Sequence, residues 1–361
     1  LKEMTTGKYG GIGAAIRYYE AKDRIAVVEP TEGMPAAEAG VKAGDIILSV
    51  GGKEMVRGDM KPQEFSSKVS EALRGEPGTS FVLKVLRPLK NDSTVMEFKI
   101  TRKNIRTNPV PYYGMVKDSI GYLALSSFTE NSAKDFKKAF IELKQKGAKS
   151  LIIDLRDNGG GSLSEAVDIV NLYVPKGQEI VVTKGKVRQA QGSYKTQNEP
   201  VDTQIPLAVL VNGATASASE IVSGSLQDLD RAVVIGSRTF GKGLVQTIRP
   251  LPYNGTLKVT TSKYYIPSGR CIQAIDYAKK NADGSVARTP DSLTTVFHTA
   301  AGREVRDGGG IRPDIEVKGD KIPNIVFTDE RRSDFRLRYP ILLGSSYIGF
   351  GRRLQTDRCR L

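Results

Sequence analysis

The sequence predicts an α/β protein with at least two folded units. The chain has 361 residues, roughly two to three times the length of an ordinary domain. Residues 9 to about 104 show mainly strand patterns, whereas strand and helix patterns alternate from about residue 110 onward. Such alternation is typical of a domain built on a largely parallel sheet. We therefore expect a small β-rich unit followed by a larger α/β unit.

In the β-rich unit, short apolar runs between turn residues predict strands, and apolar residues at helical spacing predict helices. Phe65, Val69 and Leu73 would share one face of a helix over 62–74. A shorter helix over 35–40 would end at a glycine, because glycine readily adopts the left-handed conformation that closes a helix. The expected strands lie at 25–30, between the turns of 43–52, and at 80–86.

In the larger unit, residues 151–155 form a short apolar run of the kind found in buried strands. The segment 130–146 carries Phe136, Phe140 and Leu143 on one face, which predicts an amphipathic helix. The other expected elements are strands at 120–125, 206–212 and 232–236, helices at 164–174 and 217–229, and a hairpin with an Asn-Gly turn within 249–266.

The formal net charge of +14 invites a nucleic-acid partner, but much of it comes from one segment. Residues 331–361 hold eight arginines and only two acidic residues. The sequence shows no interleaving of basic with aromatic residues and no recognisable nucleic-acid module, so we expect no such partner. No stretch approaches the roughly 20 apolar residues of a membrane-spanning helix. Because the chain opens on Leu1, we expect a mature form or a fragment.

Histidine and cysteine are too scarce for the usual metal sites. A zinc site needs about four ligands at short paired spacings, whereas Cys271 and Cys359 lie far apart and His298 is the single histidine. We expect no metal. His298 has no carboxylate partner near it in the sequence and no matching serine motif, so we interpret it as a surface residue rather than a catalytic base.

The phrase DLRDNGGG at 154–161 follows a predicted strand and precedes a predicted helix. Three consecutive glycines allow backbone N–H groups to point at a ligand or a developing anion, because no Cβ blocks the approach. A loop that merely needs positive φ angles explains the same residues equally well.

The phrase VNGATASASEI at 211–221 places Ser217 near the start of a predicted helix. There, unpaired N–H groups and the helix dipole favour negative charge, which helps both a serine nucleophile and its oxyanion. The alternative is that Ser217 or Ser219 is only an N-cap, with Glu220 completing a capping box to Ser217. Ser219 points to another helix face and is the weaker nucleophile candidate.

The phrase TFGKGLVQ at 239–246 holds Lys242 between two glycines. If neighbouring backbone shelters this lysine from water, the pKa of its ammonium falls, and a neutral lysine can act as general base for a serine. The alternative is an exposed lysine in a turn.

Residues 33–52, GMPAAEAGVKAGDIILSVGG, closely resemble a PDZ domain. In that family a glycine-containing loop offers backbone N–H groups to the terminal carboxylate of a peptide, which adds as a strand to the sheet edge. The loop is matched by Gly10, Gly11, Ile12 and Gly13. Taken alone, these four residues are also typical of a plain glycine-rich turn.

The three phrases of the larger unit, in this order after a PDZ-like unit, resemble the carboxyl-terminal processing (tail-specific) proteases, which are Ser-Lys peptidases of family S41. YYIPSGRCIQ at 264–273 and GGGIRPDIEV at 308–317 carry the same resemblance. It implies a PDZ domain at 9–104 and a mixed α/β peptidase core of the Clp protease and crotonase type at 105–330. The arginine-rich tail at 331–361 has no expected structure.

By motif position, the resemblance implies that Ser217 is the nucleophile and Lys242 its general base. Gln246 would orient the lysine, and the backbone N–H of Ala218, with one near Gly159, would form the oxyanion hole. The resemblance implies no metal and no other cofactor.

Two of these positions raise questions of distance. On a straight strand, Gln246 would lie about 13 Å from Lys242 at roughly 3.3 Å per residue, so its role requires a bend near Gly243. Asp228 matches an acidic position that has a catalytic role in some members of the family. It lies about 16 Å beyond Ser217 along the predicted helix, so we expect a structural role.

The resemblance implies a serine endopeptidase that recognises protein C-termini through its PDZ domain and cleaves through an acyl-enzyme. A non-catalytic binding or scaffold protein on the same fold is the alternative. The partners would be protein substrates, and the sequence leaves open an adaptor protein and the oligomeric state. The implied location is the periplasm or cell envelope of a bacterium.

Overall fold

The computed structural model describes residues 6–89, 92–253, 255–280 and 286–317, and it divides them into two compact units. The N-terminal unit comprises residues 8–106, and the C-terminal unit comprises residues 6–7 and 107–317. The arginine-rich segment 331–361 lies outside the described residues. We describe each unit by itself.

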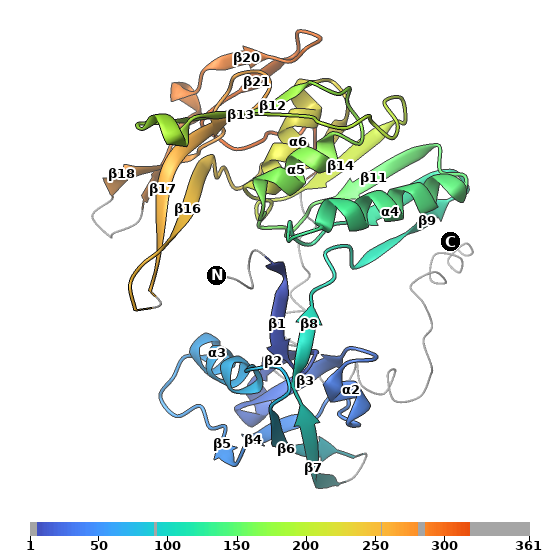
Figure 1. The fold of residues 1–361 in the computed structure, drawn as a ribbon, viewed down its shortest axis with the longest axis vertical. Coiled ribbons are helices and arrows are strands. Elements are labelled where there is room, and N and C mark those ends of the chain that lie inside the picture. Colours follow the sequence, from blue (N-terminus) through green and yellow to red (C-terminus); the bar gives the residue numbers. More distant parts are fainter. Residues whose placement is uncertain (1–5, 90–91, 254, 281–285, 318–361) are drawn as a thin grey trace, which may run out of the picture. The chain divides into compact units, whose positions relative to one another are not determined.

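The N-terminal unit is an antiparallel sheet with a helix packed on it (Figure 1). Phe65, Val69 and Leu73 of one helix are buried in its core, as their spacing predicts. The sheet order is β2 (Ala14–Tyr19), β3 (Arg24–Pro30), β4 (Ile46–Val50), β6 (Ser80–Pro88) and β7 (Ser93–Thr101), with β5 (Lys53–Glu54) beside β4; β1 (Lys8–Gly11) pairs with β8 (Lys103–Arg106), and the helices are α2 (Pro35–Glu38) and α3 (Pro62–Leu73).

The C-terminal unit contains a six-stranded sheet whose neighbouring strands are parallel except at one edge, where β9 runs antiparallel to β10. The order is β22 (Ile315–Glu316), β15 (Val233–Gly236), β14 (Leu207–Val211), β11 (Ser150–Asp154), β10 (Ile120–Ala124) and β9 (Tyr112–Lys117). Helix α4 (Ser132–Gln145) packs against β9 and β10, and helix α6 (Ala218–Asp228) packs against β15. Helix α5 (Leu163–Val170) packs against both of these helices. The alternation predicted from the sequence is confirmed.

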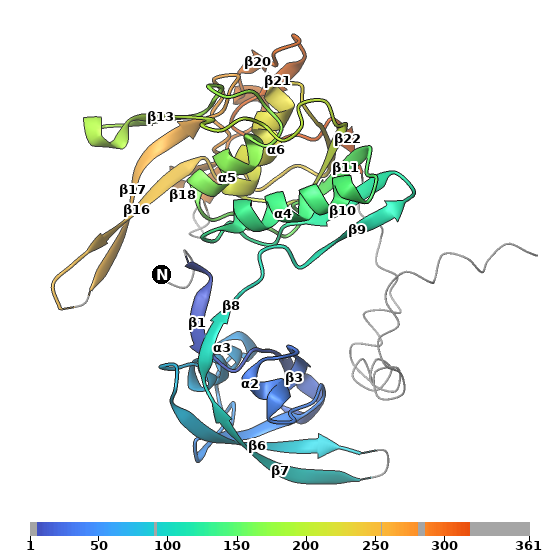
Figure 2. The same ribbon diagram turned by 45° about the vertical axis from the view of Figure 1, so that its right-hand side comes forward.

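A second sheet of this unit is antiparallel, in the order β13 (Gly192–Lys195), β12 (Glu179–Gly185), β17 (Thr256–Tyr265) and β16 (Leu244–Pro250). Figure 2 shows β16 and β17 as the long ribbon predicted around the Asn-Gly turn. Two smaller pairs follow: β18 (Ile275–Lys280) with β19 (Val286–Arg288), and β20 (Val296–His298) with β21 (Glu304–Arg306).

Helix α6 lies at the centre of the C-terminal unit, because all eleven of its residues are buried. Gly224 lets two other segments pack closely on it, since a Cβ there would lie 2.6 Å from Ile311 and 2.8 Å from Ile266. Within the described residues, no helix is long and apolar enough to cross a membrane. That same part of the chain contains no group of three or more His, Cys, Asp or Glu residues that could hold a metal ion.

Candidate active site

The glycine-rich loop after β11 packs closely between two other backbone segments, those of Phe128 and Ala218. A Cβ built on Gly161 would lie 2.3 Å from the carbonyl oxygen of Phe128, and one on Gly160 would lie 2.8 Å from the backbone nitrogen of Ala218. Their φ angles are also positive, 148° and 98° respectively. The Asn158 side chain supports the loop by accepting the Gly160 N–H at 2.9 Å. Glycine is therefore required at both positions, and the loop lies directly beside the start of α6.

Ser217 stands at the N-cap position of α6 with φ 59° and ψ −116°. An ordinary N-cap residue has an extended backbone, and a positive φ is costly for a residue with a Cβ. The Ser217 N–H donates to Oε2 of Glu220 at 2.8 Å, so the Glu220 half of the expected capping box is present. The backbone strain goes beyond what a cap needs, and it is typical of turns that present a nucleophilic serine between a strand and a helix.

The backbone N–H groups of Ala218 and Gly159 are the two donors expected to form an oxyanion hole. Within the described part of the chain, the N–H groups of Ala218 and Gly159 form no hydrogen bond. Gly159 is exposed, and open space surrounds the position that its Cβ would occupy. Ala218 is the first residue of α6, where N–H groups point out of the helix and the dipole favours an anion.

Glu220 is fully buried and joins the serine and lysine segments. Its Oε2 accepts the backbone N–H of Ser217 at 2.8 Å and that of Lys242 at 2.9 Å, so these two nitrogens lie less than about 6 Å apart. Its Oε1 accepts the Thr239 hydroxyl at 2.5 Å and the Gly241 N–H at 2.7 Å. Burial raises the pKa of Glu220, and these four donors oppose the rise.

Lys242 is half-buried, and burial lowers the pKa of its amine below the usual 10.5. The charge of Lys258 lowers this pKa further, whereas Glu220 raises it. The amine forms no hydrogen bond or ion pair with any residue that the structure describes. Its surroundings therefore favour the neutral, proton-accepting form more than water does.

Tyr264, near the end of β17, touches both segments with one hydroxyl group. This hydroxyl lies 2.5 Å from the carbonyl oxygen of Lys242 and 3.2 Å from that of Ser217. The side chain is buried, and burial raises the pKa of the phenol well above its usual value, so it remains a donor. Tyr264 and Glu220 thus bridge Ser217 and Lys242 independently of each other. The sequence indicates Glu220 only as part of a capping box, and it predicts no role for Tyr264.

Gln246 is the residue that was expected to orient the amine of Lys242. Gln246 is exposed on β16, where it pairs with Thr260, and no hydrogen bond joins it to Lys242 within the described residues. The pairing register shifts between Val245 and Gln246, which marks a β-bulge. The extra residue of this bulge is Thr261 on the partner strand β17, and the irregularity lies beyond Gly243, where the sequence required the chain to bend.

The remaining candidate residues, Ser219, Asp228 and His298, form no hydrogen bond with Ser217 or Lys242 within the described residues. The buried Ser219 hydroxyl donates to the carbonyl oxygen of Asn158 at 2.9 Å, and this hydrogen bond gives Ser219 a structural role. Asp228, the last residue of α6, is buried in an ion pair with Arg270. His298 is exposed on β20, as the sequence indicated.

In the N-terminal unit, the glycine-rich segment leads into an open sheet edge. Gly10 and Gly11 belong to β1, and Gly13 has φ 67° directly before β2, the edge strand of the sheet. The N–H groups of Ile12 and Gly13 have no partner among the residues described in this unit. Helix α3 packs beside β2, so the loop, the strand edge and the helix adjoin one another.

Comparisons with known proteins agree with the motifs. Residues 119–280 match the model of peptidase family S41, and residues 27–87 match the model of the PDZ domain. Both the resemblance seen in the sequence and the predicted mixed α/β class are thereby confirmed.

Curated relatives are similar over most of this chain. A carboxy-terminal-processing protease of Bartonella bacilliformis is 38% identical over 279 residues, which cover 76% of this chain and 61% of that protein. A chloroplastic C-terminal processing peptidase of Tetradesmus obliquus is 32% identical over 308 residues, covering 82% and 63%. A carboxyl-terminal-processing protease of Picosynechococcus is 36% identical over 271 residues, covering 74% and 62%. The chain thus spans less than two thirds of the length of these relatives.

Among solved structures, a photosystem II D1 C-terminal processing protease is 27% identical and superposes with a TM-score of 0.46, covering 90% of this chain and 76% of that one.

Proposed function

Because the chain belongs to peptidase family S41 and carries a PDZ domain ahead of its peptidase domain, we propose that it is a serine endopeptidase that acts on protein C-termini. We assign residues 9–104 to the PDZ domain and 105–330 to the peptidase core. The observation that carries the proposal is the double bridge between Ser217 and Lys242, through the Glu220 carboxylate and the Tyr264 hydroxyl.

In the proposed acylation step, neutral Lys242 accepts the proton of the Ser217 hydroxyl while Oγ attacks the substrate carbonyl carbon. The negative charge that develops on the carbonyl oxygen is stabilised by the N–H groups of Ala218 and Gly159. The protonated lysine then gives its proton to the leaving amine as the peptide bond breaks. The product of this step is an acyl-enzyme on Ser217, with the C-terminal fragment released.

Deacylation repeats the same steps with water. Lys242, neutral again, takes a proton from a water molecule that attacks the ester carbon, and the proton passes to Ser217 Oγ as the ester bond breaks. The lowered pKa of Lys242 supports this cycle, because the amine must lose its proton before each attack. For Gln246 we propose an orienting role, which requires its side-chain amide to reach the lysine amine.

We propose that the N-terminal unit binds the C-terminus of the substrate. The N–H groups of Ile12 and Gly13, which have no partner among the described residues, suit a terminal carboxylate, and the edge of β2 can accept an added strand. Gly10 and Gly11 would shape the start of this loop. The substrates would be protein chains. From the similarity to bacterial carboxy-terminal-processing proteases we propose the periplasm or cell envelope as the location of this protein.

The test is mass spectrometry of a loosely folded protein with an apolar C-terminus, incubated with the wild type, Ser217→Ala and Lys242→Ala. We expect cleavage by the wild type alone, together with a transient increase in the mass of Ser217 from the acyl group. Equal cleavage by all three proteins would show that the dyad assignment is wrong. Binding of the substrate without cleavage would favour a binding protein on the same fold.

A further inference from the structure

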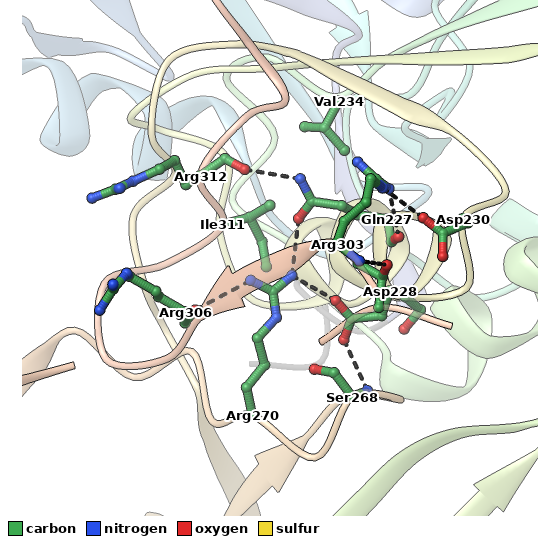
Figure 3. A network of polar contacts seen from close by, with 12 residues as sticks. Gln227, Asp228, Asp230, Val234, Ser268, Arg270, Arg303, Arg306, Ile311 and Arg312 are labelled. Carbon is green, nitrogen blue, oxygen red and sulfur yellow. Dashed lines mark hydrogen bonds and ion pairs between the residues drawn. The ribbon is translucent and has the colours of Figure 1, made fainter. Parts of the chain in front are cut away.

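Two sequence phrases that the proposed mechanism leaves unused, 264–273 and 308–317, meet at the C-terminal end of α6 (Figure 3). At the centre is Arg270, whose side chain is 1% exposed. One of its terminal nitrogens donates to Asp228 at 2.7 Å and to Gln227 at 2.9 Å, and the other donates to the carbonyl oxygen of Arg306 at 3.2 Å. The last turn of α6 is thus held by a buried cation from another segment.

The turn that carries Arg270 is attached to the same aspartate a second time. The other carboxylate oxygen of Asp228 accepts the backbone N–H of Ser268 at 3.0 Å. Within the turn, the Gly269 N–H donates to Ile266 at 2.7 Å, and the Ile266 N–H donates back to Arg270 at 3.2 Å. Residues 266–270 therefore form a closed turn that is fixed to the end of the helix.

The same segment reaches the other end of α6. Tyr264 lies two residues before this turn, and its hydroxyl contacts the carbonyl oxygens of Ser217 and Lys242. Segment 264–270 therefore runs along the whole helix, joined to its first turn by Tyr264 and to its last turn by Arg270. Between these points Ile266 packs against Gly224.

Further contacts fix the helix end to the second phrase. The Gln227 side-chain amide donates to the carbonyl oxygen of Arg312 at 2.9 Å and to Asp314 at 3.0 Å. Arg303 donates to the carbonyl oxygen of Gln227 at 3.1 Å and pairs with Asp230 and Asp314. Figure 3 shows these side chains converging on the residues that end α6. The C-terminal end of α6 is thus also fixed by contacts from Arg303 and from the segment of Arg312 and Asp314.

Stability alone is a weak reason for such a buried ion pair, because apolar residues of similar volume are often at least as stabilising. The Arg270 Nε is buried and has no partner within the described residues, so the guanidinium is not fully satisfied. The pair does fix the relative positions of the groups that it joins, because a planar guanidinium with several fixed donors specifies one arrangement of its partners.

We propose that Arg270 is a positioning residue for the Ser217–Lys242 pair: by holding segment 264–270 along α6, it places the Tyr264 hydroxyl between the two backbone carbonyls. The assignment of Ser217 and Lys242 as the reacting pair rests on the proposed function. Arg270 does not touch the reacting atoms, so its effect must appear as a change in their arrangement.

The test replaces the ion pair by apolar residues, Arg270→Met together with Asp228→Leu, which avoids leaving one buried charge unpaired. We expect kcat for an unfolded protein substrate to fall at least about tenfold while KM changes less than about twofold, because the loss concerns the chemical step. We also expect the pKa of Lys242 to rise toward its usual value as the site loosens. This titration is followed by NMR of lysines labelled with ¹³C at Cε and assigned with Lys242→Arg.

The matched control is another buried Arg–Asp pair, Arg87 with Asp45 in the N-terminal unit, where the Asp45 side chain is 0% exposed. Arg87→Met with Asp45→Leu should leave both kcat and the Lys242 titration as in the wild type. If the first double variant does not fold, Arg270→Lys retains the charge without the planar fork, and we expect a smaller fall in kcat with the same direction of change in the titration.

The inference is overturned if a folded Arg270 variant keeps both the wild-type kcat and the wild-type Lys242 titration, or if the control pair changes them equally. A wild type that cleaves no better than Ser217→Ala would refute the proposed function instead. The Lys242 titration does not require turnover, so it would still decide whether Arg270 orders this site.

Discussion

The Glu220 carboxylate binds Lys242 through the backbone N–H of the lysine, at 2.9 Å, and within the described residues it forms no bond with the lysine amine. A direct ion pair would stabilise the ammonium and raise its pKa. Here burial and Lys258 dominate, and the pKa of Lys242 is lowered. The carboxylate therefore holds the lysine segment in place while the amine can still lose its proton.

The pH dependence of turnover follows from this pKa. We expect kcat to rise with pH through a midpoint below 10.5, because only the neutral amine accepts the serine proton. On the acid side of that midpoint the rate should fall about tenfold per pH unit. The measurement is single-turnover cleavage across the pH range in which the protein remains folded. A flat profile, with the chemical step rate-limiting, would contradict Lys242 as the base.

Replacing Glu220 by glutamine should damage both stability and turnover. The amide keeps one acceptor oxygen but turns an NH₂ group toward donors that now serve the carboxylate, among them the N–H groups of Ser217 and Lys242. We expect the free energy of unfolding to fall by about 3 kcal/mol, measured by urea denaturation, and kcat to fall at least about tenfold.

The control for this variant is Glu165→Gln. Glu165 also accepts backbone N–H groups at a helix start, those of Asn131 at 2.9 Å and Ala133 at 2.8 Å at the beginning of α4. We expect the free energy of unfolding of this variant to fall by about 1 kcal/mol, and its kcat to remain that of the wild type. Equal losses of kcat in the two variants would mean that Glu220 matters only for folding.

Much of this arrangement could be predicted from the sequence, because local patterns determine it. The apolar periodicity of α3 and α4 and the buried run of β11 gave the correct elements. The phrases around Ser217 and Lys242 indicated the two reactive segments, because glycine and small residues mark close approaches of backbone.

The contacts that join these segments could not be predicted in the same way. The roles of Tyr264 and Arg270 depend on how β17 and the turn after it lie along α6, which is a matter of tertiary packing. A tyrosine at the end of a strand and an arginine in a turn have no local pattern that distinguishes them from surface residues. The ion pair does explain why Asp228, far from Ser217 along the helix, has a structural partner instead of a catalytic one.

Removing the Tyr264 hydroxyl isolates one of the two bridges. We expect Tyr264→Phe to lower kcat about tenfold with KM nearly unchanged, because the carbonyl oxygens of Ser217 and Lys242 lose their common donor. Stability should fall by about 1 kcal/mol, the typical value of one hydrogen bond. Tyr265→Phe, which alters the neighbouring residue beside Lys184, is the control. A wild-type kcat in Tyr264→Phe would mean that Glu220 alone holds the two segments.

The PDZ loop can be tested separately from the chemistry. A side chain at Gly13 would meet Met34 within 2.4 Å, and φ is 67° there, so Gly13→Val should distort the loop beside β2. We expect KM for a substrate with a free C-terminus to rise about tenfold, equivalent to about 1.4 kcal/mol of binding, with kcat unchanged. The same substrate with an amidated C-terminus is the control, because it lacks the carboxylate. An equal change for both substrates would contradict capture of the carboxylate by this loop.

The glycine loop offers the sharpest test of close packing at the candidate site. In Gly160→Ala, the new Cβ would lie 2.6 Å from the carbonyl oxygen of Ala216 and 2.8 Å from the Ala218 nitrogen, both of them backbone atoms that cannot move aside independently. The φ of 98° adds strain for any residue with a Cβ. We therefore expect kcat to fall by at least about a hundredfold, close to the effect of losing an oxyanion-hole donor. Gly213→Ala, where the nearest atom would be 3.9 Å away, should remain active. If the Gly160 variant folds and cleaves like the Gly213 variant, the loop does not form part of the reacting site.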